Sequence, residues 1–386
     1  MKLKIERVKL WGAVSVLAKV INPKSTLPIL ANVKCVVKDM HLKMVGSDSE
    51  MWYQTTLPLV EQEGEGEFCV SAQMLQNALA VLPDQPVVIL VGDDQRLTLI
   101  HQTGETFFPT VGTEEYPEQM EQEFTSTVQV DGIELADAIK RCAWSIANDD
   151  LRPVLNGVCI SVEKDCVDVV ASNGYTLAKT SLIGEGSDFS RVILPRKAAK
   201  ILPDLLWADD IELKLNETYA QLELVGEDVL DGEDKNITKK VLTFRLVEGK
   251  YPNYNSVIPT DNDKVGSVVR SWLMNALKQT IPFASSSTSM VQFEFTKGKL
   301  YLKGQDIDFN TGSTASVDMS IYDGDNVKIA FDGSRLLTML QNLKSEFVEF
   351  HLKESDKPAY ILPKEVEDTE EEEKILMLIM PMQMKD

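Results

Sequence analysis

Three stretches of this chain repeat one pattern of strand and turn. They are LPILANVKCVV at residues 27–37, RPVLNGVCISV at residues 152–162 and SMVQFEFTK at residues 289–297. Each is followed by further strand-like segments and then by a helix-like segment. Gly46, Ala171 and Gly304 occupy matching places, 125 residues (171 − 46) and 133 residues (304 − 171) apart. Solenoid repeats span only about 20–50 residues, so each copy is expected to be a domain of its own.

The repeats divide the 386 residues into three predicted domains, 1–125, 126–258 and 259–386. Alternation of apolar and polar residues predicts antiparallel strands that are covered on one face. Apolar residues at spacings of three and four predict two helices in each domain. The expected helices are 8–21, 72–82, 133–146, 196–206, 270–281 and 334–343. The predicted fold class is therefore α+β, with two helices packed on antiparallel sheets in each of three copies.

Composition limits the class of protein. Hydrophobic residues make up 44% of the chain and the formal net charge is −21. The five cysteines, an odd number without a CxxC spacing, are expected to be free thiols in a reducing cytosol. No apolar run approaches the roughly 18 residues of a membrane span, and the first residues have no signal-like apolar core. We therefore expect a cytoplasmic protein without a membrane partner.

The overall charge conceals a segregation between helices and strands. With their adjoining turns, the six predicted helices contain twelve basic and three acidic residues, a net charge of +9 (12 − 3). The rest of the chain then carries −30 (−21 − 9). Such helices are often simply solvated, but the joint bias across the six favours a polyanion such as duplex DNA. Contact with phosphates alone would be independent of base sequence.

The sequence contains no pattern typical of catalysis. The three histidines lie far apart, and Walker, GxSxG, HExxH and GxGxxG motifs are absent. Asp48, Asp306 and Asp308 lack the clustered spacing of a metal site. We therefore predict no catalytic residue, no metal and no cofactor. Two alternatives stay open: an enzyme that uses Asp306 or Asp308, and an acidic three-domain interaction protein that never touches DNA.

Six segments together carry a resemblance to a known family. They are TLPILANV (26–33), RPVLNGV (152–158), VVASNGYTLA (169–178), ILPRKAAKIL (193–202), EGKYPNYNSVIP (248–259) and MPM (380–382). The chain resembles the bacterial sliding clamp, the beta subunit and processivity factor of the replicative DNA polymerase, over essentially its whole length. The resemblance implies three DNA-clamp domains and a head-to-tail homodimeric ring that encircles duplex DNA. It also implies a clamp loader, the polymerase and other replication and repair proteins as partners.

The resemblance further implies a pocket for short partner peptides between the second and third domains. The matching positions are Leu155, Ser172, Gly174, Tyr175, Thr176, Leu177, Pro252, Val257, Pro358, Met380, Pro381 and Met382. Without the resemblance, these residues would be taken for ordinary core. Thr176 and Ser256 stand where many family members have arginine, and Gln383 replaces a basic residue. The pocket rim is therefore expected to be less positive and its peptide more apolar or less acidic.

Two further sets of residues follow. The dimer contact that the family implies is assigned to Phe107 and Phe108 against Ile281 and Phe283, although paired phenylalanines could equally be core. The candidate DNA-binding residues are Lys24, Lys140, Arg141, Arg152, Arg196, Lys197, Lys200, Arg270, Lys278 and Arg335. The acidic segment 364–373 is expected to be a solvated loop, with a recognition role as the alternative.

Overall fold

The computed structural model describes residues 1–163, 166–186, 191–206, 210–229, 235–364 and 374–384. Residues 230–234, and all of the acidic segment 364–373 except Lys364, lie outside these residues. Within the described chain, unit 1 contains 1–132, 186 and 204–246, and unit 2 contains 133–185, 191–203 and 247–384. The middle repeat is thus divided between two compact units.

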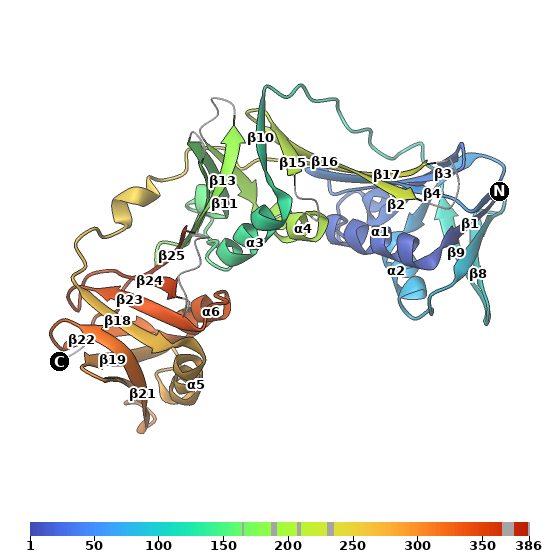
Figure 1. Cartoon of the computed structure of the whole chain (residues 1–386). Helices are drawn as coiled ribbons and strands as arrows, with labels where there is room; N and C mark the ends of the chain where they lie inside the picture. The colour runs from blue at the N-terminus through green and yellow to red at the C-terminus, as the bar shows by residue number, and fades with distance from the viewer. Residues whose placement is uncertain (164–165, 187–190, 207–209, 230–234, 365–373, 385–386) are drawn as a thin grey trace. The chain divides into compact units, whose positions relative to one another are not determined.

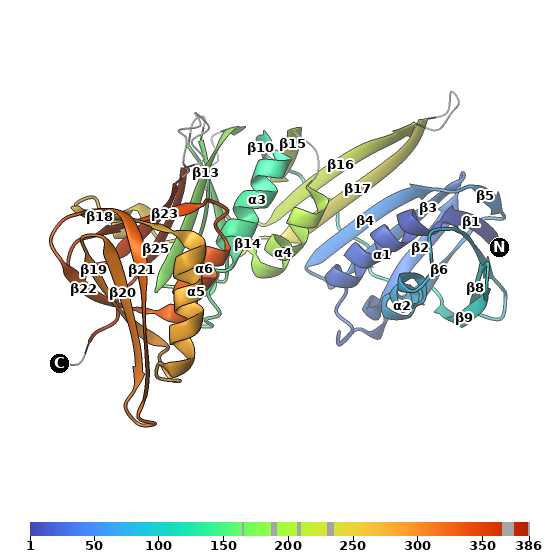
Figure 2. The same cartoon turned by 60° about the horizontal axis from the view of Figure 1, so that its bottom comes forward.

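Unit 1 contains a long antiparallel sheet built from two repeats. Its strand order is β6 (Gly66–Ser71), β2 (Asn32–Lys38), β3 (His41–Ser47), β4 (Met51–Pro58), β17 (Lys235–Arg245), β16 (Tyr219–Val229), β15 (Asp210–Leu215) and β10 (Ser126–Asp131). The first four strands belong to the first repeat and the last four to the middle repeat. The two groups are joined by β4 and β17, which run side by side (Figure 2). In this pairing Tyr53 lies opposite Leu242.

Unit 2 contains a second sheet with an equivalent order. It runs β14 (Arg191–Pro195), β11 (Gly157–Glu163), β12 (Cys166–Ser172), β13 (Thr176–Gly186), β25 (Lys374–Ile379), β24 (Ala359–Lys364), β23 (Phe347–Leu352) and β18 (Lys264–Val269). Here β13 of the middle repeat pairs with β25 of the last repeat, and Ala178 lies opposite Met377. Each sheet is therefore four strands of one repeat followed by four strands of the next.

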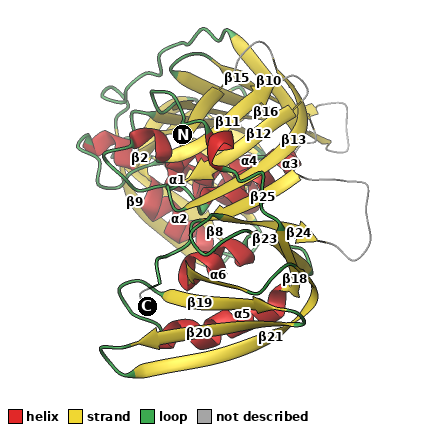
Figure 3. Ribbon diagram, turned by 90° about the vertical axis from the view of Figure 1, so that its left-hand side faces the viewer, coloured by secondary structure: helices red, strands yellow, loops and turns green. Residues whose placement is uncertain are grey.

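Two shorter sheets hold the remaining strands. In unit 1, β5 (Glu61–Glu63) and β7 (Pro86–Val91) flank β1 (Lys2–Glu6), and β8 (Arg96–His101) and β9 (Gly104–Val111) follow β7. In unit 2, the order is β22 (Val327–Asp332), β19 (Met290–Thr296), β20 (Lys299–Asp306) and β21 (Thr311–Asp323) (Figure 3). Each of these sheets therefore corresponds to one half of a long sheet.

The six predicted helices are confirmed to within a few residues. They are α1 (Arg7–Val20), α2 (Ala72–Ala80), α3 (Gly132–Ala143), α4 (Arg196–Leu205), α5 (Arg270–Thr280) and α6 (Gly333–Gln341). The apolar stripe of each helix is buried against strands, as α1 shows with Leu10, Val14 and Leu17. In unit 2, α5 and α6 lie on one side of the strands of the last repeat (Figure 1). These elements confirm the α+β class.

The matching positions predicted at Gly46, Ala171 and Gly304 are confirmed by register. Each occupies the same place in a hairpin, opposite Tyr53, Ala178 and Ser313 respectively. A Cβ atom on Gly304 would lie 2.7 Å from the carbonyl oxygen of Thr280 at the end of α5. Glycine is therefore needed there because helix and strand approach closely.

One arginine in each repeat binds the carboxyl-terminal end of a neighbouring helix. Arg7 at the start of α1 donates to the carbonyl of Leu79 in α2 (3.0 Å). Arg270 at the start of α5 donates to Leu340 of α6 (3.1 Å) and to the nearby Ser345 (2.7 Å). In the middle repeat, Arg196 of α4 binds the carbonyl of Ala147 just beyond α3 (2.7 Å). Helix ends leave carbonyls unsatisfied, so these guanidinium groups fasten the helix pairs.

We expect Arg270→Gln to destabilise the protein, because two carbonyls near the end of α6 lose charged donors. The loss should be about 2 kcal/mol of the free energy of unfolding, seen as a lower midpoint of thermal unfolding. Lys278→Gln, which changes an exposed cation on the same helix, is the matched control and should shift the midpoint little. An equal shift in both variants would contradict the fastening role of Arg270.

Candidate functional site

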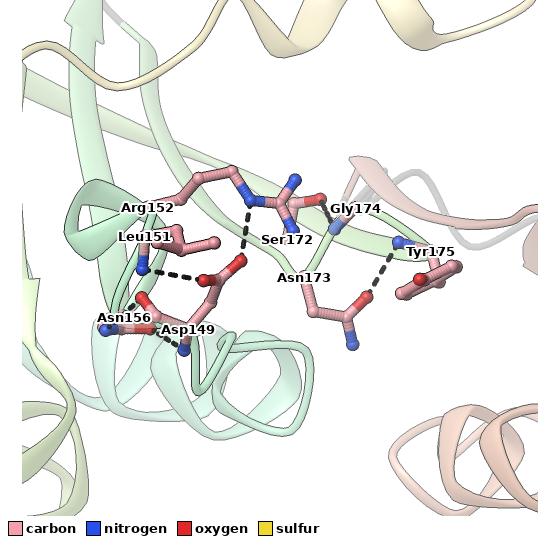
Figure 4. A network of polar contacts seen from close by, with 8 residues as sticks. All are labelled: Asp149, Leu151, Arg152, Asn156, Ser172, Asn173, Gly174 and Tyr175. Carbon is pink, nitrogen blue, oxygen red and sulfur yellow. Dashed lines mark hydrogen bonds and ion pairs between the residues drawn. The ribbon is translucent and has the colours of Figure 1, made fainter.

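The turn between β12 and β13 is held by its own side chains (Figure 4). The Asn173 side-chain oxygen accepts the N–H groups of Tyr175 and Thr176, both at 2.9 Å. The Ser172 hydroxyl accepts the N–H of Gly174 (3.2 Å) and donates to the carbonyl of Thr176 (2.8 Å). Gly174 has a φ of +86°, a conformation that favours glycine. The turn therefore presents Tyr175, which is 57% exposed, in a fixed position.

The same turn recurs in all three repeats. Asp48 accepts the N–H groups of Glu50 and Met51, just as Asn173 does in the middle repeat. Asp306 accepts those of Asp308 (3.0 Å) and Phe309 (3.2 Å) in the last repeat. Within the described chain, no group of three His, Cys, Asp or Glu residues is placed to hold a metal ion. Asp306, one of the two residues that the enzyme alternative named, therefore acts as a turn residue.

The last repeat has a longer hairpin at this turn. Asp306 pairs with Thr311 there, whereas in the middle repeat the pairing ends where Ser172 faces Leu177. The residues at the tip, Ile307 and Phe309, are 83% and 74% exposed. The turns of the middle and last repeats therefore present different exposed side chains, Tyr175 in one and Ile307 and Phe309 in the other.

An apolar floor lies beneath the turn of the middle repeat. Leu155, Leu177 and Leu378 are buried in one cluster with Tyr251 and Tyr254. These residues come from the middle repeat, from the last strand of the chain and from the segment that connects the two repeats. The sequence analysis placed Leu155 and Leu177 in the lining of a pocket, whereas in the structure both side chains are buried in this cluster.

The exposed part of the candidate pocket is formed by the turn and two neighbouring segments. The Met380 N–H donates to the carbonyl of Tyr175 (2.8 Å), so the end of β25 lies along the turn. Pro358 precedes Ala359, which faces Ile379 in the adjacent strand. The exposed candidates are Gly174, Tyr175, Pro252, Val257 and Met380, and the half-buried ones are Ser172, Pro358, Pro381 and Met382. Met382 donates its N–H to the carbonyl of Ala330 (2.8 Å).

Asp168 fixes the connecting segment to the sheet, a role that the sequence did not reveal. Its carboxylate accepts the Tyr254 hydroxyl (2.8 Å) and the Ser181 hydroxyl (2.6 Å) and pairs with the Lys179 ammonium (2.7 Å). Burial opposes ionisation, but these donors hold the pKa of Asp168 below its usual value. Tyr254 begins the short helix that ends at Val257, so Asp168 positions one wall of the pocket.

Thr176 was expected at the pocket rim, and this is wrong. Its side chain is only 1% exposed, and its hydroxyl bonds that of Ser145 at 2.8 Å. The replacement of arginine at this position therefore says little about the charge of the rim. Ser256 and Gln383 are exposed as expected.

Two arginines assigned to DNA lie instead at the turn. The Arg152 guanidinium nitrogen Nη1 is 3.1 Å from the place that a Cβ on Gly174 would occupy, and its Nε pairs with Asp149 (2.8 Å; Figure 4). The Arg335 guanidinium carbon lies 4.3 Å from the centre of the Tyr175 ring, a cation–π arrangement. The sequence could have indicated these ion pairs, because an aspartate stands three residues before each arginine.

The remaining basic candidates fall into two groups. Lys24, Lys140, Lys200 and Lys278 are exposed, and their ammonium groups have no ion-pair partner among the residues that the structure describes. Arg141 was expected on the surface, but it is 8% exposed and lies 3.9 Å from Asp137. Arg196 and Arg270 bind the carbonyls described above, and Lys197 is half-buried and engaged within the fold. The exposed cations of the helices are thus mainly lysines.

The predicted dimer residues also differ among themselves. Phe107 is exposed and carries the Arg96 guanidinium over its ring at 3.6 Å. Phe108, next to it on β9, points the other way and is buried, so its assignment to an interface is wrong. Phe283 is exposed, and Ile281 is half-buried.

Comparisons with known proteins place this fold among the three-domain DNA clamps. Sequence models of the DNA polymerase III beta subunit match the chain as its N-terminal domain (1–121), central domain (129–253) and C-terminal domain (255–383). The chain therefore belongs to the DNA polymerase III beta subunit family. Its function is that of a DNA sliding clamp for the replicative polymerase. Among the described helices, none is long and apolar enough to cross a membrane.

The relatives span the whole chain. The beta sliding clamp of Streptomyces coelicolor is 29% identical and is covered over its full length, as this chain is. That of Pseudomonas putida is 26% identical over 94% of this chain and 95% of its own. A Pseudomonas aeruginosa clamp bound to griselimycin has a TM-score of 0.85 at 25% identity over both whole chains. The Thermotoga maritima beta subunit (TM-score 0.86, 23% identity, both chains fully covered) shares the fold.

Proposed function

We propose that two copies of this chain join head to tail into a ring around duplex DNA. A clamp loader places the ring on DNA, and the ring tethers the polymerase and other proteins through the pocket at Tyr175. The domains are bounded at residues 125/126 and 258/259. The protein acts in the cytoplasm, as a binding scaffold without catalysis, metal or cofactor.

The incomplete sheets carry this proposal. Two long sheets are complete within the chain, each made from half-sheets of consecutive repeats. The half-sheet that ends in β21 and the half-sheet that ends in β9 correspond to the two parts of a third. Residues 311–318 of β21 and 104–109 of β9 each pair on one side only among the described strands. Unpaired edges of this kind invite pairing with another chain, and β9 of one copy matches β21 of the other.

The internal junctions also support one particular register for that pairing. Tyr53, Ala178 and Ser313 occupy equivalent hairpin positions. Leu242, Met377 and Thr106 are likewise equivalent, because they face Leu222, Ile361 and Leu99 in corresponding neighbouring strands. Tyr53 faces Leu242, and Ala178 faces Met377. By this equivalence we expect Thr106 of one copy to lie opposite Ser313 of the other.

Helix contacts accompany each internal junction and support the same arrangement. In unit 1, Lys19 of α1 pairs with Asp204 of α4 at 2.6 Å. In unit 2, Asp137 of α3 pairs with Lys344 beyond α6, also at 2.6 Å. The equivalent pair at the dimer junction is α5 with the partner's α2. An open groove of about 690 Å³ lies between α5 and β21 beside the exposed Trp272, and α2 offers the exposed Met74.

A double-cysteine variant tests the ring directly. In a Cys166→Ser background, Thr106→Cys with Ser313→Cys should form an intermolecular disulfide under mild oxidation. The equivalent internal pair is Ala178 and Met377, three residues along the strands from Tyr175 and Met380, which are hydrogen-bonded to each other. Hydrogen-bonded and non-hydrogen-bonded pairs alternate along antiparallel strands, so Ala178 and Met377 form a non-hydrogen-bonded pair with close Cβ atoms. Non-reducing electrophoresis should show a covalent dimer. After loading onto nicked circular DNA with a clamp loader and ATP, the oxidised ring should survive detergent until the circle is cut.

The control moves one cysteine along the same face of the strand. Thr106→Cys with Ala315→Cys places the two Cβ atoms at a diagonal distance, about 7–8 Å between the backbone positions, where cross-linking is slow. Faster cross-linking of the control would overturn the register. Monomeric sedimentation without cross-links would overturn the dimer, and loss from an intact circle would overturn the encirclement.

The DNA-facing surface is proposed to depend on lysines. Lys24, Lys140, Lys200 and Lys278 are exposed cations on or next to the helices, while the arginines there bind backbone carbonyls, are buried or, as Arg335 does, pair with an aspartate. A lysine ammonium is a compact, hydrated point charge without the fixed bidentate geometry of a guanidinium. Such charges attract phosphates without selecting a position, which suits a ring that slides.

We expect Lys140→Gln, Lys200→Gln and Lys278→Gln together to weaken binding to duplex DNA. Each lost phosphate contact should reduce the dependence of log K on log salt by about 0.9. Titration of fluorescent duplex at several salt concentrations measures this slope. The control, Lys297→Gln with Lys303→Gln and Lys357→Gln, removes the same charge from exposed positions on turns and a strand. An equal change in the control would mean that net charge alone was measured.

A further inference from the structure

We propose that the tip of the β20–β21 hairpin, residues 306–310, binds the partner copy at the dimer junction. The exposed Ile307 and Phe309 of one copy pack against an apolar surface that the other copy forms with Met74 and Val111. This inference rests on the proposed ring and names a contact that closes it. The occupant of the surface is a second copy of this chain, because the surface adjoins the edge that β9 offers to β21.

The tip is longer than the corresponding turns of the other repeats. Ser313 stands nine positions after Gly304 (313 − 304), whereas Ala178 stands seven positions after its counterpart Ala171 (178 − 171). The last repeat therefore has two additional residues in this turn. The hairpin projects beyond the end of α5 (Figure 2). The added length lets the tip reach past the strands that pair at the junction.

Two large apolar side chains occupy the tip. Ile307 is 83% exposed and Phe309 is 74% exposed in a single copy. The Asp306 carboxylate accepts the backbone N–H groups of Asp308 (3.0 Å) and Phe309 (3.2 Å), so the turn is fixed before a partner binds. Less conformational freedom is then lost on association. Adjacent apolar side chains with this exposure are typical of an interaction surface.

The junction inside unit 2 indicates what the tip contacts. There the turn of the middle repeat meets the start of α6, where the Arg335 guanidinium carbon lies 4.3 Å from the centre of the Tyr175 ring. The equivalent residue of the first repeat is Met74, the third residue of α2 as Arg335 is of α6. Each gives its N–H to the side chain that caps its helix. Met74 of one copy is therefore expected to meet the tip of the other, and a methionine sulfur packs favourably against an aromatic ring.

The strand that enters the junction provides a second correspondence. Met382, just beyond β25, donates its N–H to the carbonyl of Ala330 in β22. Val111 holds the same place in the first repeat, where it pairs with Cys69 of β6. Cys69 and Ala330 each stand two residues before the cap of the next helix. Val111 and Met74 are 43% and 49% exposed, so the surface that faces the tip is apolar.

The helices at the dimer junction lack the ion pairs of the internal junctions. Positions are counted from the first residue of each helix, because the fourth residue is buried in all six. The uncharged counterparts are Asn275 and Pro83 for the pair Asp137 and Lys344, and Pro282 and Ala80 for the pair Lys19 and Asp204. Salt screens ion pairs but does not weaken apolar burial. A junction held by the tip should therefore depend weakly on salt.

A charge exchange across the junction tests the contact. Phe309→Asp and Met74→Lys are made separately and together in the full-length chain, and the dissociation constant of the dimer is measured by sedimentation velocity. We expect Phe309→Asp to weaken the dimer about tenfold for each of its two junctions, because apolar burial is lost. Met74→Lys should weaken it less, about threefold for each junction, because the lysine stem still covers apolar surface.

The two substitutions should compensate when they are combined, because a carboxylate then faces an ammonium group. At about 0.1 M salt, the double variant should bind at least about fivefold more tightly than the product of the single effects predicts. At about 1 M salt this gain should fall to about twofold or less, because the ion pair is screened. The dimer of the unmodified chain should change by less than about threefold over the same range.

Ile321→Asp is the matched control. It places the same charge at an exposed apolar position near the other end of β21 and should leave the dimer as tight as before. Thermal unfolding of every variant checks that the single chain is folded. The substituted side chains are all exposed in one copy, so we expect little change in the unfolding midpoint.

The outcomes separate this contact from the ring itself. An unmodified chain that sediments as a monomer would overturn the proposed ring and this inference with it. A dimer that Phe309→Asp leaves unchanged, or that Ile321→Asp weakens equally, would overturn the tip contact and leave the ring intact. Strictly additive effects of the two exchanged residues would overturn the pairing of Phe309 with Met74.

Discussion

The structure depends on antiparallel strand pairing between consecutive repeats. A strand at the edge of a sheet leaves a row of backbone N–H and C=O groups unpaired, and these groups need partners. Each repeat has two such edges, and where two repeats are consecutive in the chain, an edge of one pairs with an edge of the other. The six residue pairs of β4 with β17 and of β13 with β25 are the visible result. The middle repeat pairs with the first repeat through β17 and with the last repeat through β13. Its strands therefore belong to two compact units.

Arginines and lysines on the helices have different roles. Arg7, Arg196 and Arg270 use a planar, multiply donating group to satisfy helix carbonyls, a task for which lysine has no matching geometry. Lysines remain at the exposed positions. Arginine commonly recognises phosphate groups in proteins, but these three arginines stabilise the fold. A count of positive charges therefore overstates how many can face a polyanion.

Local patterns in the sequence were sufficient for the elements but not for their partners. Spacings of three and four located every helix, because a buried stripe such as Leu10, Val14 and Leu17 is a local property. The pairing of Tyr53 with Leu242 joins residues almost two hundred positions apart, and no local pattern specifies it. The pocket residues were named through the family resemblance. Its details differed where side-chain direction mattered: Thr176 turns inward to Ser145, and Arg335 reaches the ring of Tyr175.

The two open edges, β9 and β21, complement each other and not themselves. A contact of this kind has a direction, so copies can be added at either end of a growing chain of subunits. Only the rotation from one subunit to the next decides whether the assembly closes after two copies or continues as a helical filament. In the proposed ring, the twist between consecutive repeats sets this rotation. A substitution that changed that twist would then convert the closed particle into a polymer.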